Sequence, residues 1–340
     1  MTTNRQGQGR QGLVTVFGYG PTGEATVERL RARGQRVRVV QRRRPANLPR
    51  DVEFQVCDVL KAEDVLAAMR GADQGVITTG FEYNGSVWKV AWPKAMANFI
   101  AAAVATGARM IQIDNLYMYG PQDGVLTEET PLTTYGVKPA ARAEATRMWM
   151  KAVREKSLLW TSLRAPDFYG PGVDRSHIGE VGFGNLAKGK AAMLIMSPDT
   201  PHAFAYVPDI GRATVSLLDA EDDAFGQAWH APCAPTRTPR QVLEIGAKAL
   251  GQKLKVTAMP GAMLPVMGVF VPFMRELHEM RFTWNRPYHV SAEKFSKRFW
   301  ADATSFEVGA RETALAFRAA VVTEAKQENL MSVPPAKAGA

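Results

Sequence analysis

The hydrophobic positions of the first half of the chain follow two alternating patterns. Short apolar runs that suit buried strands alternate with longer segments whose apolar residues recur at helical spacing. The predicted strands cover residues 13–17, 36–40, 53–57, 74–79, 110–113 and 160–163. This alternation predicts an α/β fold with a doubly wound parallel sheet of the Rossmann type.

Beyond residue 170 the alternation loosens into segments rich in proline and glycine. The predicted elements there are short strands at 192–196, 203–207 and 228–230, a helix at 239–250 and a strand at 255–258. We therefore expect a dinucleotide-binding domain over 13–170. Residues 171–330 are expected to form mainly a smaller substrate-binding cap, with some segments returning to the first domain. A disordered arm at 1–12 and a disordered tail at 331–340 are also expected.

A glycine motif joins the first predicted strand to a predicted helix at 24–33. Gly18, Gly20 and Gly23 have G-x-G-x-x-G spacing. The first glycine permits a tight turn, the second lets backbone approach a pyrophosphate, and the third lets the helix pack closely on the sheet. The helix start also offers free N–H groups to phosphate. The motif predicts a dinucleotide site formed by Gly18, Tyr19, Gly20, Pro21, Thr22 and Gly23; the alternative is a structural turn.

The end of the second predicted strand carries no acidic residue. Gln41 is followed by Arg42, Arg43 and Arg44. An acidic side chain at this point would bind the ribose hydroxyls of NAD, whereas guanidinium suits the additional phosphate of NADP. We expect NADP(H) to be preferred through Arg42 and Arg43, with NAD(H) still possible. The alternative is a basic turn that faces water.

Two further strand ends supply cofactor candidates. Asp58 and Val59 follow the third strand, where the carboxylate could reach the adenine amino group and Val59 could pack on the ring. Alternatively, Asp58 caps a predicted helix at 63–69. Thr79 and Gly80 end the fourth strand at the sheet edge where open α/β sheets bind ligands.

A predicted loop at 81–92 is rich in aromatic residues, including Tyr83, Trp88 and Trp92. These rings either form the wall of a substrate pocket or cover the sheet edge. Pro93 suits the first turn of a helix that continues to residue 106.

The segment after the fifth strand contains the candidate polar side chains Asn115, Tyr117 and Tyr119. They would point to one side if the chain stays extended; otherwise this is a polar strand end. Further along, Pro139 is predicted to be the first residue of a helix to residue 155. Lys138 would then lie just outside that helix, and Tyr135 in the loop before it.

Composition narrows the function classes. The net charge is +9, but the basic residues do not share one periodic face, so nucleic-acid binding is not expected. Cys57 and Cys233 lack metal-ligand spacing, so no metal site is expected, and reduced thiols favour a cytoplasmic protein. Residues 1–12 do not suggest a signal peptide. The apolar stretch 259–274 is too short and too broken for a membrane span and is expected to be a buried or partner-facing lid; the alternative is a membrane-surface element.

These motifs together resemble the extended short-chain dehydrogenase/reductases of the NAD-dependent epimerase/dehydratase family, over residues 12–320. The resemblance is carried by VFGYGPTG, CDV, YMYGP, YGVK, LRAPDFYGPG, AFAYVPDIGRA and VSAEKFSKRF. It implies that a tyrosine moves a proton while hydride passes to or from the nicotinamide. A lysine lowers the tyrosine pKa, and a serine or threonine holds the substrate oxygen.

The sequence departs from the family pattern at three positions. Asn115 stands where the family has serine or threonine. Tyr135 and Lys138 are three residues apart instead of four, so the pair need not meet in the usual way. The stretch DNLYMYG resembles a subset of the family in which the usual tyrosine is not obvious, so Tyr117 rivals Tyr135 as the acid; the remaining alternative is that neither is. His202 stands where relatives that act on nucleotide sugars have an arginine for the diphosphate, which disfavours such substrates.

The resemblance also implies roles for the segment after the sixth strand. The backbone of Ala165 and Pro166 would lie against the nicotinamide, and Asp167 would contact the cofactor or cap the loop. Tyr83, Trp88, Phe168 and His202 are the candidate substrate-binding residues.

The leading hypothesis is an NADP(H)-dependent oxidoreductase that acts by hydride transfer on a small, fairly apolar carbonyl or alcohol. The alternatives are an epimerase or dehydratase with tightly held NAD(P), and a non-catalytic NADP(H)-sensing regulator. The resemblance further implies a homodimer through helices at 94–105 and 140–155, with the apolar residues Phe99, Met148 and Val153 facing the partner.

Overall fold

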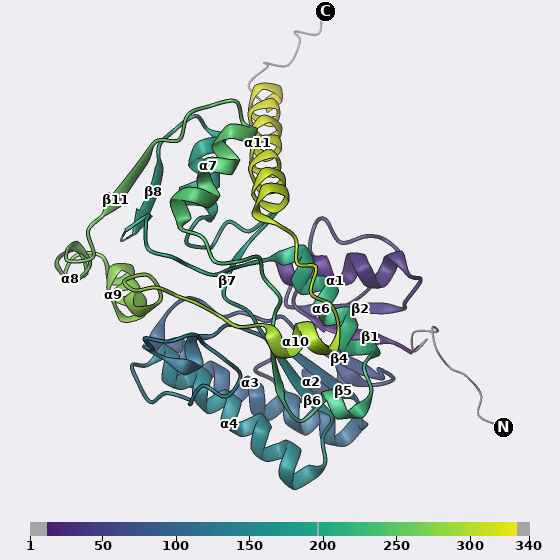
Figure 1. Ribbon diagram of the computed structural model, residues 1–340. Coiled ribbons are helices and arrows are strands. Elements are labelled where there is room, and N and C mark those ends of the chain that lie inside the picture. The colour runs from purple at the N-terminus through teal and green to yellow at the C-terminus, as the bar shows by residue number, and fades with distance from the viewer. Residues whose placement is uncertain (1–11, 196, 332–340) are drawn as a thin grey trace, which may run out of the picture.

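A seven-stranded parallel sheet forms the centre of the computed structural model, which describes residues 12–195 and 197–331 (Figure 1). The strand order is β10-β6-β5-β4-β1-β2-β3, and every neighbouring pair is parallel. Parallel strands are joined by crossover helices, which leaves both faces covered. The strands are β1 (Val14–Phe17), β2 (Val37–Gln41), β3 (Glu53–Val56), β4 (Gln74–Ile77), β5 (Arg109–Asp114), β6 (Trp160–Arg164) and β10 (Ala228–His230).

Helices pack on both faces of this sheet. One face is covered by α1 (Pro21–Ala32) and α6 (Val207–Asp219), and the other by α2 (Ala62–Met69), α3 (Gly85–Thr106) and α4 (Lys138–Lys156). Side chains alternate along β1, so Val16 packs with the first group and Phe17 with the second. The predicted Rossmann-type fold is confirmed.

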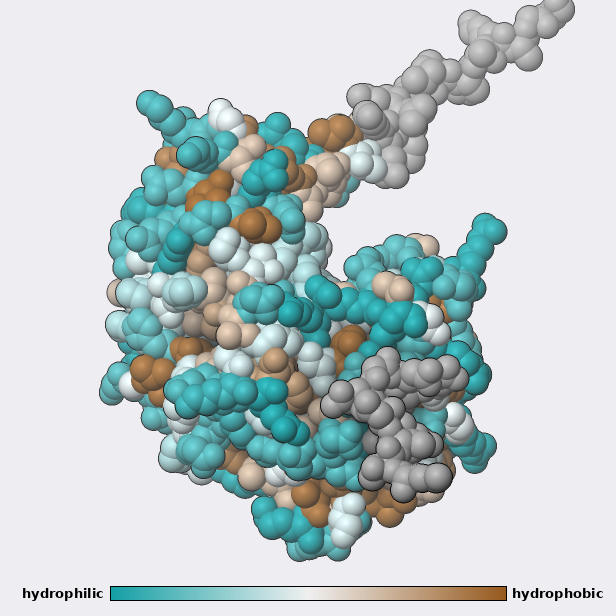
Figure 2. Space-filling view, turned by 45° about the vertical axis from the view of Figure 1, so that its right-hand side comes forward, coloured by the Kyte–Doolittle hydropathy of each residue, from teal (hydrophilic) through white to brown (hydrophobic). Residues whose placement is uncertain are grey.

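The remaining elements form a smaller part above the carboxyl edge of the sheet (Figure 1). Two parallel strand pairs lie there, β7 with β9 and β8 with β11. Figure 2 shows that the surface is hollowed between the part that carries α11 and the lobe around α1. The elements are β7 (Asp167–Tyr169), a π-helix (Gly179–Gly184), α5 (Asn185–Ala187), β8 (Ala192–Ile195), β9 (Phe204–Tyr206), α7 (Pro239–Ala249), β11 (Val256–Met259), α8 (Met263–Met267), α9 (Pro272–Glu279) and α11 (Phe306–Met331). Helix α10 (Glu293–Arg298) packs instead against β10 of the central sheet.

Several element boundaries differ from the predictions. Helix α1 begins three residues earlier than expected, at Pro21. Helix α3 begins at Gly85, because the side chain of Asn84 accepts hydrogen bonds from the N–H groups of Ser86 and Val87; Pro93 therefore lies inside the helix. The strand at 228–230 belongs to the central sheet, beside β6.

Phe99 corrects part of the dimer prediction. Its ring is 1% exposed and meets Phe17 edge to face at 4.9 Å, so it packs on the chain's own sheet. The homodimer stays a prediction, as do the domain boundaries and the cytoplasmic location. Of the expected terminal segments, 1–11 and 332–340 lie outside the described residues, and Met331 ends α11. Among the described helices, none has the length and apolar character needed to span a bilayer.

Candidate functional site

The glycine loop leaves open space in front of helix α1. Gly18 has φ +106°, a left-handed conformation that favours glycine. A Cβ at Gly23 would lie 2.3 Å from the Gly18 carbonyl oxygen, so only glycine allows this close packing. A Cβ at Gly20 would meet no described atom within 4 Å. The first turn of α1 faces this space with N–H groups that lack intrahelical partners, so the loop fits a pyrophosphate.

At the end of β2, Gln41 turns back toward the glycine loop. Its side chain accepts a hydrogen bond from the Tyr19 N–H at 3.1 Å and donates one to the Arg43 carbonyl at 2.7 Å. Arg42 and Arg43 are exposed, and neither has an ion-pair partner among the described residues. The guanidinium of Arg44 lies 5.5 Å from the centre of the Phe54 ring. Two guanidinium groups are therefore free to meet a phosphate beside the loop.

The remaining cofactor candidates lie along the same sheet edge. Asp58 is half-buried beside Val59 and accepts a hydrogen bond from the Leu60 N–H at 3.0 Å. The N-cap of α2 is Lys61. The alternative prediction, that Asp58 caps this helix, is therefore wrong. The Thr79 hydroxyl donates to the Phe17 carbonyl at 3.0 Å, and Gly80 is exposed.

The chain after β5 turns instead of staying extended. The Asn115 side chain accepts a hydrogen bond from the Tyr117 N–H at 3.0 Å, which closes a short turn and leads into a 3-10 helix at Tyr117–Tyr119. The prediction that Asn115, Tyr117 and Tyr119 share one side is therefore wrong. Tyr119 is fully buried, and its hydroxyl accepts a hydrogen bond from Arg164 at 2.7 Å.

A neutral histidine completes the environment of Tyr119. His230 Nδ1 lies 2.9 Å from the Ser291 carbonyl, to which it must donate, so Nε2 accepts the Tyr119 hydroxyl proton at 2.8 Å. Burial lowers the pKa of His230 to about 3, and the nearby Arg164 acts in the same direction. This closed set of hydrogen bonds gives Tyr119 a structural role.

Lys138 is the first residue of α4, not a residue before the helix, and its side chain is completely buried. Its ammonium forms ion pairs with Glu276 and Glu279, the latter at 2.5 Å. Glu276 also accepts a hydrogen bond from the Gly85 N–H at the start of α3, and Glu279 accepts one from the Lys138 N–H at 3.2 Å. Two carboxylates one turn apart on α9 thus cap two helices and enclose one lysine.

The two candidate tyrosines have different surroundings. The Tyr135 hydroxyl donates to the Glu279 carbonyl at 3.3 Å, and its ring contacts Phe282. Tyr117 stacks on Trp88 at 6.3 Å, and Tyr83 packs against the same two clusters of buried side chains. Burial is the main cause that raises the pKa of Tyr117, so this phenol is held in its protonated form.

Asp167 lies at the centre of a second group of side chains. Its carboxylate accepts hydrogen bonds from His202 Nε2 and Trp284 Nε1, each at 3.1 Å. Burial alone would raise the pKa of this carboxyl, but the bond from His202 and the nearby imidazoles hold it below its ordinary value. His177 stacks on Trp284 at 5.2 Å, and His202 stacks on Tyr288 at 4.9 Å.

A late segment of the chain covers these side chains. Residues 260–284, here called the lid, bury Leu264, Leu277, Met280, Phe282 and Trp284, and this cluster packs against Tyr83, Tyr117 and Tyr135. The sequence motifs did not point to Glu276, Glu279 or Trp284, because more than a hundred residues separate them from the segments they contact. Their only sequence signal was their position just after the apolar stretch.

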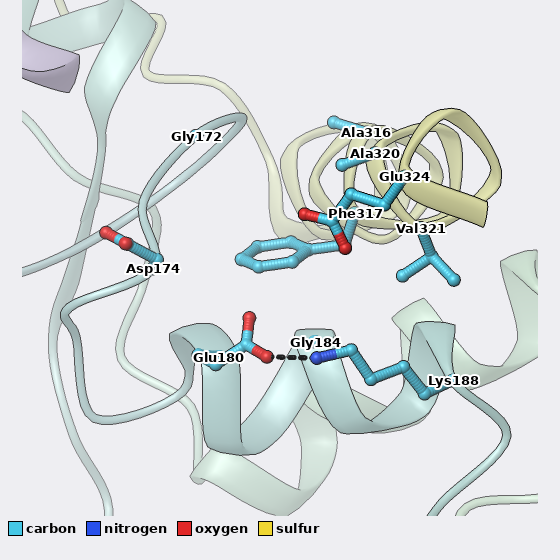
Figure 3. A pocket seen from close by; sticks show the side chains of 10 residues that line it. All are labelled: Gly172, Asp174, Glu180, Gly184, Lys188, Ala316, Phe317, Ala320, Val321 and Glu324. Carbon is cyan, nitrogen blue, oxygen red and sulfur yellow. Dashed lines mark hydrogen bonds and ion pairs between the residues drawn. The ribbon is translucent and has the colours of Figure 1, made fainter. Parts of the chain in front are cut away.

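Other predicted residues lie around this group. Ala165 and Pro166 are buried between β6 and β7, and Phe168 is half-buried against the core. A hollow of about 410 Å³ elsewhere, between α5 and α11, is lined by none of the predicted site residues (Figure 3). Within the described residues, no group of histidine, cysteine and acidic side chains could hold a metal.

Comparisons with known proteins agree with the fold. Two solved structures are similar along almost their whole length: UDP-glucose 4-epimerase of Thermus thermophilus in complex with NAD (21% identity, 91% of this chain and 99% of that chain, TM-score 0.69), and the dTDP-glucose 4,6-dehydratase DesIV of Streptomyces venezuelae with NAD bound (19%, 90% and 97%, TM-score 0.74). At these identities they show the fold. No curated protein matches the chain. The model of the NAD dependent epimerase/dehydratase family matches residues 14–229, and the chain therefore belongs to this family of extended short-chain dehydrogenase/reductases.

Proposed function

We propose that this protein is an NADP(H)-dependent oxidoreductase that transfers hydride to or from a small, fairly apolar carbonyl or alcohol. The observation that supports it most is the set of side chains where the lid packs on the sheet edge. Aromatic rings gather there, among them Tyr83, Tyr117 and Trp284, and the charged groups beside them are mainly carboxylates. Carboxylates repel a substrate diphosphate, whereas the rings favour an apolar molecule.

The preference for NADP(H) rests on the end of β2. Arg42 and Arg43 extend into solvent beside the glycine loop, and the side chain of Gln41 is already engaged with that loop. A guanidinium binds a phosphate through two parallel charge-assisted hydrogen bonds. The free arginines therefore favour a dinucleotide that carries the additional ribose phosphate.

In this proposal Tyr117 is the proton donor. The bound dinucleotide supplies or accepts the hydride. Tyr117 donates its phenolic proton to the substrate oxygen, while Trp88, on which its ring stacks, holds the phenol in place. The amide of Asn115 positions the same oxygen. We favour Tyr117 over Tyr135 because the Tyr135 hydroxyl already donates its hydrogen bond to the Glu279 carbonyl.

Lys138 has a supporting role. Its ammonium is buried, 5.1 Å from the centre of the Tyr83 ring, and Glu276 and Glu279 balance its charge, so in this arrangement it holds the lid against the tyrosines. To contact the ribose beside the nicotinamide, it must exchange one of its two carboxylate partners. Movement of α9 would permit that exchange.

An epimerase or dehydratase reaction is the second candidate. It is favoured by membership of the family and by the solved structures, whose names describe a UDP-glucose 4-epimerase and a dTDP-glucose 4,6-dehydratase. The group of Asp167 and His202 argues against it, because an anionic carboxylate there disfavours a sugar diphosphate.

Absorbance at 340 nm separates the two candidates. The purified protein is incubated with NADPH or NADH and a panel of aldehydes and ketones, and separately with UDP-glucose and dTDP-glucose. We expect NADPH oxidation with at least one apolar carbonyl and no conversion of either nucleotide sugar. Sugar conversion without net oxidation of added cofactor would replace the proposed reaction with the second candidate.

A further inference from the structure

The outer surface of the lid consists of apolar side chains. Residues 261–274 contain no charged residue. Within this stretch, the side chains that are 41–83% exposed are Met263, Val266, Val269, Phe270, Val271 and Phe273. The exposed run from Val269 to Phe273 is continuous, and Phe270 is 83% exposed. Such a patch on a folded protein marks a binding surface, because exposed apolar runs of this length are otherwise avoided.

The buried face of the lid explains why its outer apolar side chains remain exposed to solvent. Leu264, Leu277 and Met280 already point inward and fill the cluster above the tyrosines. The exposed residues therefore have no further place in the core. Helix α8 lies at the outer edge of the molecule, on the side away from α1 (Figure 1).

Basic residues precede and follow this stretch in the sequence. Lys253, Lys255 and Arg275 are exposed, and none forms an ion pair with a described residue. No acidic residue occurs between positions 251 and 275. The two nearest acids in the sequence, Glu276 and Glu279, are paired with Lys138. Apolar side chains in a stretch that basic residues flank complement the surface of an anionic bilayer, where rings enter the acyl boundary and cations meet headgroup phosphates.

We propose that the apolar face of α8 and α9 docks on the surface of an anionic phospholipid bilayer, with no segment crossing it. The whole chain carries a net charge of +9, which favours the same surface from a distance. Docking places the membrane against the segment that covers Lys138 and Tyr135. The proposal does not depend on which reaction the site performs.

Vesicle co-sedimentation of the full-length protein tests it. The vesicles are phosphatidylcholine alone or phosphatidylcholine mixed with phosphatidylglycerol. The test variant is V266S/V269S, whose positions are 65% and 73% exposed; the matched control is V56S/V90S, whose positions are 64% and 65% exposed. Both variants keep the charge of the wild type. Far-UV circular dichroism and size-exclusion chromatography accompany each measurement.

We expect the wild type and the V56S/V90S control to bind the mixed vesicles equally, and V266S/V269S to bind at least about tenfold more weakly. Binding to phosphatidylcholine alone should be weaker for all three proteins. The proposal is overturned if the wild type does not sediment with mixed vesicles, or if both variants bind alike, because the net charge alone would then explain binding. It is also overturned if V266S/V269S changes the oligomeric state and leaves vesicle binding unchanged.

Discussion

The ammonium of Lys138 lies 2.5 Å from a carboxylate oxygen of Glu279, although 141 residues separate the two in the sequence. Glu276 contacts the same ammonium. This contact joins the lid to the starts of α3 and α4, so the segment that covers the candidate site is also held by its central lysine. The charged groups of Lys138, Glu276 and Glu279 therefore contribute both to the stability of the fold and to the closure of the lid over the candidate site.

Replacing Lys138 with methionine should destabilise the fold. Two carboxylates would remain close together without the cation that they enclose, and breaking a buried ion pair from one side costs about 3–5 kcal/mol. Because Glu276 and Glu279 keep some solvent exposure, with 23% and 18% of their side chains accessible, we expect the lower end of this range. Urea unfolding at pH 7 measures the loss.

The matched control for this change is K138M/E276Q/E279Q. It removes all three charges and keeps the volume of the side chains, so most of the stability lost in K138M should return. If the triple variant is no more stable than K138M, the ion pairs do not explain the loss.

Gly20 and Gly23 should respond differently to alanine. A Cβ at Gly20 meets no described atom within 4 Å, and its φ of −78° suits alanine, so the free protein should lose no more than about 0.5 kcal/mol. The new methyl group would occupy the space left for a pyrophosphate, and affinity for NADPH should fall by at least about tenfold. Calorimetry and urea unfolding check both parts.

G23A is the comparison for that experiment. Its Cβ would lie 2.3 Å from the Gly18 carbonyl oxygen, which is backbone and cannot move freely, so this variant should lose stability. Unchanged NADPH affinity in G20A would show that the dinucleotide does not lie on the loop.

The double variant R42A/R43A should weaken NADPH more than NADH. Both arginines are exposed without ion-pair partners among the described residues, so their loss should leave the fold intact. Removing charge-assisted bonds to a phosphate should lower NADPH affinity by about tenfold or more. The control is R31A, which removes the exposed ion pair between Arg31 on α1 and Asp51. Equal losses for both dinucleotides would contradict the assigned phosphate site.

The order of strands and helices in the first half could be predicted because it depends on local patterns. The G-x-G-x-x-G spacing, the strand lengths and the lack of an acid after β2 are all local features. The partners of Lys138 could not be predicted, since Glu276 and Glu279 reach it only after the lid folds over the sheet edge. The side to which Tyr119 points could not be predicted either. The Asn115 side chain closes a turn after β5, so the side chains that follow do not alternate as they would in an extended strand.

Tyr117 and Tyr119 should respond differently to phenylalanine. Y119F leaves Arg164 and His230 without a shared hydroxyl in a fully buried place, so it should cost about 1–3 kcal/mol of stability. Y117F removes the proposed proton donor and should lower kcat by about a hundredfold or more with a smaller effect on stability. Urea unfolding and NADPH oxidation measure the two effects, with Y135F as the control that keeps most activity. High activity in Y117F and loss in Y135F would reverse the assignment.

The folded protein should lose stability as the pH falls from 6.5, partly because of His177. Burial, with the neighbouring His202 acting in the same direction, lowers the pKa of His177 to about 3. In the unfolded chain the imidazole keeps a pKa near 6.5. Above pH 6.5 the imidazole is neutral in both the folded and the unfolded state, so its contribution to the free energy of unfolding does not change with pH. Below it the unfolded state binds a proton that the folded state does not, so stability falls until the pH reaches about 3.

H177F isolates this contribution, because phenylalanine keeps the stacking that His177 makes on Trp284 at 5.2 Å and cannot bind a proton. One pH unit corresponds to about 1.4 kcal/mol for one proton, so between pH 7 and pH 5 the wild type should lose about 2 kcal/mol more than H177F. Urea unfolding at the two pH values gives this difference directly. Parallel losses in the two proteins would mean that His177 takes up its proton in the folded state, which requires water or an acceptor beside its ring.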